Sequence, residues 1–82
     1  MNTQTSGHGH PVAASLIALG DTICTPDGTV ARVITKGQAR GEWGLVTIGW
    51  AELRTGHTGR RAGIFPTEQV TLVSPSPMRG AA

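Results

Sequence analysis

Pro66 constrains the fold of this chain more than any other residue, because it divides two short β-type runs near the carboxyl end. Proline has no N–H group to donate to a sheet, so it ends a strand rather than lying inside one. Its ring also holds the preceding residue, Phe65, in an extended conformation, which suits the last residue of a strand. We therefore expect strands over residues 61–65 and 70–73, with Ile64 or Phe65 filling the core.

The composition favours several short strands over helices. Glycine occurs twelve times in 82 residues, which suits many tight turns and weakens helix interiors. The aromatic residues are Trp43, Trp50 and Phe65, so the core must consist mainly of Val, Ile and Leu. A chain of this length forms one small domain.

A hairpin is expected before the Pro66 break. Residues 21–25 and 29–35 read as strands, and Pro26-Asp27-Gly28 between them favours a tight turn. Ile23 should point inward. Asp21 is expected to accept hydrogen bonds from backbone N–H groups at the start of the first strand.

The longest strand candidate spans residues 45–53. Alternation places its bulkier side chains, Val46, Ile48 and Trp50, on the face toward the core. Two polar, glycine-rich loops are expected beside this strand, at residues 36–44 and 54–60.

The two ends of the chain differ in composition from the middle. Residues 1–11 are polar and glycine-rich, so we expect a flexible arm, and residues 74–82 contain Ser-Pro-Ser-Pro, so we expect a disordered tail. The domain should cover residues 12–73, with its core at residues 20–73.

The apolar segment at residues 12–19 fits two structures. Its alanines allow one or two helical turns, while Leu16-Ile17 could equally lead into a strand. We expect the segment to cover one end of the domain or to mediate self-association through Leu16, Ile17 and Leu19.

Several function classes are disfavoured. Cys24 is alone, so no intramolecular disulfide forms, and we expect a reducing, cytoplasmic setting. The apolar segment at 12–19 is too short to cross a bilayer, and no membrane association is expected. His8-Gly9-His10 lacks further clustered ligands, so no metal site is predicted. No catalytic constellation occurs, so we expect no enzyme activity and no cofactor.

Positive charge is concentrated in the middle of the chain. Between Arg32 and Arg61 there are six basic and two acidic residues, a net charge of +4 against +2 for the whole chain. Such asymmetry favours an acidic partner, and arginine binds phosphate with two parallel hydrogen bonds. In small barrels the two polar loops can lie near one end, which would bring the charges together. The predicted nucleic-acid-binding residues are Lys36, Arg40, Trp43, Arg54, His57, Arg60 and Arg61.

Five motifs occur in the order found in one superfamily. They are Gly20-Asp21, Asp27-Gly28, Trp50, Gly63-Ile64-Phe65-Pro66 and Val70-Thr71-Leu72-Val73. On these motifs the chain resembles the SH3-like small β-barrels, in particular the KOW-type and the plasmid- or phage-type barrels of bacteria. The resemblance implies an all-β, SH3-like small barrel of about five short antiparallel strands.

The chain has a more distant resemblance to the type II dihydrofolate reductases, which share the SH3-like fold. Those enzymes use a Gln-Ile-Tyr run just before the proline, whereas this chain has Gly63-Ile64-Phe65. The resemblance therefore extends to the fold and not to the reductase site. Proline-rich peptide binding is also disfavoured, because the chain has no Tyr and its first long loop is basic.

The sequence thus predicts a non-catalytic small binding module. The preferred partner is DNA or RNA, bound by the basic loops. The alternative is a protein-interaction or homo-oligomeric structural module of a phage or other mobile element, because short barrels expose strand edges to partners.

Overall fold

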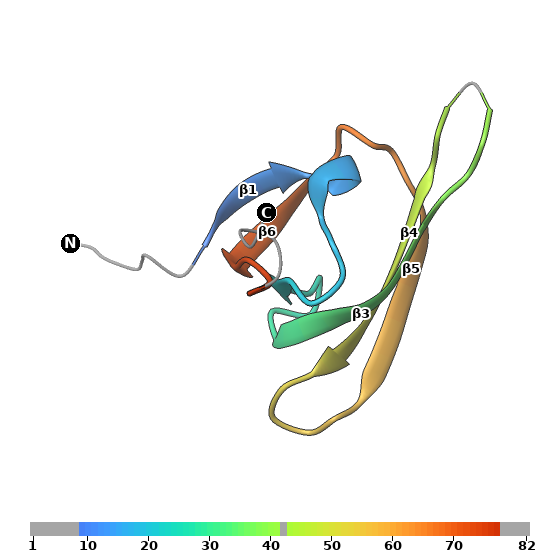
Figure 1. Cartoon of the computed structure of the whole chain (residues 1–82). Helices are drawn as coiled ribbons and strands as arrows, with labels where there is room; N and C mark the ends of the chain where they lie inside the picture. The colour runs from blue at the N-terminus through green and yellow to red at the C-terminus, as the bar shows by residue number, and fades with distance from the viewer. Residues whose placement is uncertain (1–8, 42, 78–82) are drawn as a thin grey trace.

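Short β-branched runs and glycine-rich turns fold into six antiparallel strands, shown in Figure 1. The structure is a computed structural model and describes residues 9–41 and 43–77. One turn of 3-10 helix, η1 (Ala14–Leu16), follows the first strand. The strands are β1 (His10–Ala13), β2 (Thr22–Cys24), β3 (Val30–Gln38), β4 (Val46–Glu52), β5 (Thr58–Ile64) and β6 (Gln69–Ser74).

The strands form a single sheet in the order β1-β6-β2-β3-β4-β5. The sheet curls, so that β3, β4 and β5 form a long ribbon on one side of the core while β1, β2 and β6 lie on the other (Figure 1). The fold is a small all-β barrel, as the sequence predicts. The structure has one strand more than the five expected, and the additional strand is β1. It pairs with β6 from His10↔Leu72 to Ala13↔Gln69, so it includes the last two residues of the expected arm. Residues 1–8 lie outside the described residues.

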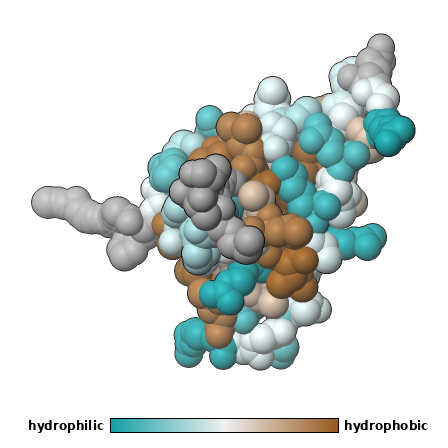
Figure 2. All heavy atoms as spheres, viewed as in Figure 1, coloured by the Kyte–Doolittle hydropathy of each residue, from teal (hydrophilic) through white to brown (hydrophobic). Residues whose placement is uncertain are grey.

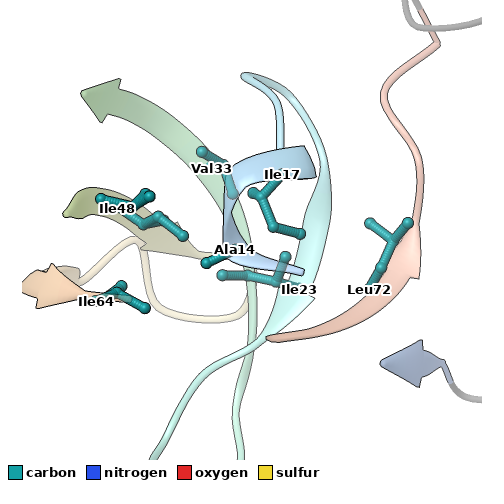
Figure 3. Close-up of a cluster of buried hydrophobic side chains, with 8 residues drawn as sticks. Ala14, Ile17, Ile23, Val33, Ile48, Ile64 and Leu72 are labelled. Atoms are coloured by element: carbon teal, nitrogen blue, oxygen red, sulfur yellow. The ribbon is translucent and has the colours of Figure 1, made fainter. Parts of the chain in front are cut away.

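The core consists of aliphatic side chains from strands β2 to β6 and from the segment after β1 (Figure 3). Val46 and Ile48 are fully buried, and Trp50 is half-buried against them, which agrees with the predicted inward face of β4. Ile64 is buried and Phe65 is exposed, so Ile64 takes the core position near Pro66. The buried hydrophobic residues are Ala14, Ile17, Ile23, Ala31, Val33, Val46, Ile48, Ile64 and Leu72.

The segment at residues 12–19 contains the expected helical turn, as a single 3-10 turn, whereas Leu16-Ile17 does not lead into a strand. Val12 and Ala13 belong to β1, and Ala14–Leu16 forms η1. Ile17 is fully buried in the core, so its expected role as an anchor for self-association is wrong. Leu16 and Leu19 are 63% and 58% exposed and lie on the surface.

The expected hairpin and proline break are present. The Pro26-Asp27-Gly28 turn is closed by the Gly28 N–H group, which donates to the Thr25 carbonyl at 2.9 Å, and β2 pairs with β3. After β5, the Glu68 N–H group donates to the Phe65 carbonyl at 2.9 Å across Pro66. The Ala14 N–H group then donates to the Glu68 carbonyl at 2.8 Å, which attaches η1 to this turn.

Both polar loops are shorter than the sequence predicts. β3 continues through Gln38, because Gly37 and Gln38 pair with Thr47 and Val46 of β4. Likewise β5 begins at Thr58, which pairs with Ala51. The pairing partner supplies the hydrogen bonds, so polar and glycine residues extend both hairpins despite their low strand propensity.

Asp21 accepts backbone hydrogen bonds, as predicted, and also holds part of the expected tail. The carboxylate is fully buried. Its Oδ2 accepts from the Ala18 N–H group at 2.8 Å, and its Oδ1 accepts from the Ser76 N–H group at 2.7 Å. Because of this contact Ser76 is buried, so the expectation of disorder from residue 74 is wrong as far as Pro77. Residues 78–82 lie outside the described residues.

We predict that Asp21→Ala lowers the free energy of unfolding by about 2–5 kcal/mol, because the N–H groups of Ala18 and Ser76 lose a charged, buried acceptor. Urea denaturation measures this change. Asp27→Ala is the control, since Asp27 is exposed on the hairpin turn, and it should change stability by less than about 0.5 kcal/mol. Equal effects of the two substitutions would contradict the role given to Asp21.

Candidate nucleic-acid interface

The two basic loops lie at opposite ends of β4. Arg40 and Trp43 belong to the β3–β4 turn, while Arg54 and His57 belong to the β4–β5 turn, and Figure 1 shows the two turns at the two ends of the ribbon. The seven residues of β4 span about 23 Å. The expected convergence of these loops is therefore wrong, because successive turns of an up-and-down sheet lie at alternate ends.

Lys36 lies in β3 rather than in a loop. It pairs with Ile48, and its Nζ donates to the Ser15 carbonyl of the segment after β1 at 2.7 Å. The side chain thus connects the 3-10 turn to the sheet, on the same side as the core. This contact assigns Lys36 a structural role.

Arg60 and Arg61 are adjacent on β5 and point to opposite faces of the sheet. Arg61 pairs with buried Ile48, and its guanidinium forms an ion pair with the Glu68 carboxylate at 2.6 Å. Arg60 pairs with Gly49 and is exposed on the outer face. The two predicted arginines therefore cannot act on one surface.

Arg32 joins Arg60 on the outer face, although it was not among the predicted binding residues. It lies between buried Ala31 and Val33 of β3, so its side chain points outward, and it is exposed. Arg32 pairs with Ala51 of β4, which pairs with Thr58 of β5. On the outer face these three residues lie next to the pair of Gly49 and Arg60. Strand geometry places the Cα atoms of Arg32 and Arg60 roughly 12 Å apart. The alternation of apolar Ala31, charged Arg32 and apolar Val33 in the sequence could have indicated that Arg32 faces outward.

No large side chain projects from the outer face between these two arginines. Gly49 pairs with Thr35 on one side and Arg60 on the other. The Thr35 hydroxyl occupies the space that a side chain at position 49 would need. Small and polar residues thus lie between the arginines, and both guanidinium groups are accessible.

The described carboxylates lie elsewhere or have partners. Asp21 is buried, Asp27 is on the β2–β3 turn, and Glu68 is paired with Arg61. Glu52 Oε1 accepts a hydrogen bond from the Thr55 hydroxyl at 3.0 Å. Within residues 9–41 and 43–77, Arg61–Glu68 is the only ion pair, so Arg32 and Arg60 have no carboxylate partner there.

Two exposed aromatic rings meet near the β3–β4 turn. Trp43 is 64% exposed and Phe65 is 52% exposed, and their ring centroids lie 6.0 Å apart in an edge-to-face arrangement. In this geometry the ring that contributes its edge keeps both faces clear of its partner. The pair provides accessible aromatic surface at the end of the ribbon opposite Arg54 and His57.

Trp50 lies on the inner side of the ribbon and presses against Gly59 of β5. A Cβ atom at position 59 would lie 2.6 Å from Nε1 and 2.7 Å from Cε2 of the indole. Such a distance is far inside van der Waals contact. Only glycine at position 59 therefore permits the indole to lie across the β5 backbone.

The described residues hold no cluster of metal-binding side chains. Among them, no three His, Cys, Asp or Glu side chains lie close enough to hold a metal ion. His10 is exposed on β1, and His8 lies outside the described residues. Cys24 is half-buried in β2, and its Sγ lies 3.8 Å from the Thr25 carbonyl. In the part of the chain that the structure covers, no helix has the length and apolar character needed to span a membrane.

No protein-family model and no curated protein sequence matches this chain. The structure is similar to that of a translation initiation factor eIF-5A family protein from Naegleria fowleri, with a TM-score of 0.72 and 14% sequence identity. The match covers 82% of this chain and 48% of that chain, so the chain spans about half the length of the similar protein. At this identity the similarity supports the small β-barrel fold.

We predict that Gly59→Ala displaces the Trp50 indole and lowers stability by about 1–3 kcal/mol, because the added methyl group overlaps the ring. Urea denaturation and the emission maximum of Trp50, measured in a Trp43→Phe background, test both effects. Gly37→Ala in β3 is the matched control, since an added Cβ there meets no atom within 4 Å. Unchanged emission in Gly59→Ala would contradict the described packing.

Proposed function

We propose that the protein is a non-catalytic, cytoplasmic module that binds DNA or RNA with the outer face of the β3–β5 ribbon. The observation that carries this proposal is the placement of Arg32 and Arg60. Both are exposed on one face, and neither has a carboxylate partner among the described residues. Arginine binds phosphate oxygens through two parallel hydrogen bonds. Two guanidinium groups with only small side chains between them therefore suit a phosphate backbone.

Other residues of the ribbon extend this surface. Arg54 and His57 lie at the end near Arg32, and Arg40 lies at the other end, in the same turn as Trp43. Aromatic rings beside basic groups are typical of surfaces that bind single strands, because bases stack on the rings while the cations contact phosphates. The resulting binding should be weak, salt-dependent and largely independent of sequence.

The fold is consistent with this function. As part of the proposal, we assign the barrel to the SH3-like superfamily, on the ordered motifs and on the β6-β2-β3-β4-β5 strand order. The similar solved structure is named as a member of a translation initiation factor family, and that name is compatible with a nucleic-acid setting. The similarity itself concerns the fold.

A protein-interaction or oligomeric module is the second candidate. β1 and β5 are the two edges of the sheet, and each has one partner strand within the described residues. Hydrophobic residues also reach the surface on the face seen in Figure 2, and Leu19 and Ile34 are exposed. Edge strands pair readily with other strands. A mass measurement in solution tests self-association, since a strict monomer at high concentration would contradict it.

We predict that the double substitution Arg32→Ala with Arg60→Ala weakens binding to duplex DNA at low salt by at least about tenfold. The slope of log affinity against log salt concentration should also fall by about two, because two phosphate contacts are lost. Fluorescence anisotropy with labelled duplex at several salt concentrations measures both quantities.

Arg61→Gln is the matched control for this experiment. It removes one positive charge, against two in the double variant. Arg61 follows Arg60 directly but lies on the opposite face of β5 and is already paired with Glu68. Duplex affinity and salt slope should therefore stay near the values of the unmodified protein. No duplex binding at low salt, or equal losses in the control and the double variant, would reject the outer face as the binding surface.

A further inference from the structure

A pocket of about 240 Å³ opens on the inner side of the ribbon, away from Arg32 and Arg60. It lies where β4 and β5 face β6 and the end of β2. Its walls include the side chains of Trp50, Ile48, Ile64 and Val70, and its polar lining includes Arg61 and Gln69. A volume of about 240 Å³ suits one planar ring and is smaller than the pockets that hold drug-sized ligands.

The indole of Trp50 forms a fixed aromatic wall of this pocket. The ring lies across the β5 backbone at Gly59, as described above, and is packed against the core. The indole is half-buried, so part of its surface stays accessible. An indole held in this way can stack on a ligand ring without losing much conformational freedom.

The polar lining offers both donors and acceptors. The Arg61 guanidinium lines the pocket and is oriented by its ion pair with Glu68. The Gln69 amide, also in the lining, has two donor hydrogens and an acceptor oxygen. An aliphatic side chain would fill the apolar part of the pocket but make no hydrogen bond with these polar groups. A ring with hydrogen-bonding edges matches both parts of the pocket.

We propose that this pocket binds one unstacked nucleobase of a single-stranded nucleic acid, with the base stacked on Trp50 and its edge hydrogen-bonded by Arg61 and Gln69. Arg60 supports this choice over a peptide side chain, because it places a cation for the phosphate backbone on the same strand, on the outer face. β5 is an edge of the sheet, so a nucleotide can cross it with its phosphate near Arg60 and its base on the inner side. The inference rests on the proposed function and specifies its substrate as single-stranded.

The test uses the full chain with Trp43→Phe, so that Trp50 is the only fluorescent indole. The protein is titrated with a short single-stranded oligonucleotide, with the corresponding abasic strand and with the duplex of the same length. The base-containing strand should quench Trp50 emission and bind about tenfold more tightly than the abasic strand, as expected for stacking of one base. The duplex and the abasic strand should leave Trp50 emission unchanged.

Three variants separate this inference from the proposed function. Trp50→Leu should abolish the preference for the base-containing strand while duplex affinity stays unchanged. Arg61→Gln and Gln69→Ala change surface groups, so they keep the inference testable if Trp50→Leu does not fold. Each should reduce the preference for the base-containing strand severalfold. Equal binding of base-containing and abasic strands, with Trp50 emission unchanged, overturns the inference and leaves the proposed function standing. Absence of all binding rejects both. If an apolar peptide quenches Trp50 emission and none of the oligonucleotides does, the inference is overturned in favour of a protein partner.

Discussion

The barrel depends on the buried carboxylate of Asp21. One oxygen accepts from Ala18 just before β2, and the other accepts from Ser76 just after β6, 55 residues later in the chain. The carboxylate therefore joins the beginning and the end of the domain at the place where β2 and β6 pair. A buried charge is unfavourable without partners, and here two backbone N–H groups supply them. The aliphatic core lies directly beside this junction, with Ile23 and Leu72 in register.

Two irregularities in the ribbon decide which side chains face outward. Between β3 and β4 the register passes from Val33↔Trp50 to Thr35↔Gly49, so Ile34 is an extra residue on β3. Thr35 therefore faces outward and Lys36 faces inward, where it reaches Ser15. Between β4 and β5 the register passes from Ile48↔Arg61 to Val46↔Ile64, with two residues of β5 opposite Thr47. Bulges of this kind reorient side chains along a strand.

Much of the fold could be predicted from local sequence patterns. Pro66, the Pro26-Asp27-Gly28 turn and the alternation through Val46 and Ile48 each act within a few residues, so their effects can be recognised without tertiary information. The role of Asp21 was also predicted at one end, because a polar side chain at a strand start satisfies nearby N–H groups. Its contact with Ser76 depends on the pairing of β2 with β6 and has no local signal.

The candidate site was less accessible from the sequence. Simple alternation could not assign Lys36 or Arg61 to a face, because each lies next to a bulge that shifts the register. The loops containing Arg40 and Arg54 were expected to converge, yet the length of β4 keeps them apart. Arg32 was counted as a charge of the segment and not as a binding residue, although its position between Ala31 and Val33 marks it as outward-facing. The pocket beside Trp50 involves four strands and has no sequence motif of its own.

The pairing of β1 with β6 has a consequence for the order of folding. His10 and Leu72 are partners, so this part of the sheet cannot form until nearly the whole described chain is available, and closing so long a loop is slow. The hairpins β3–β4 and β4–β5 involve only near neighbours in sequence and need no such wait. The ribbon that bears Arg32 and Arg60 is thus the part of the molecule best suited to take shape early, during synthesis, with the β1–β6 side completing the barrel around it afterwards.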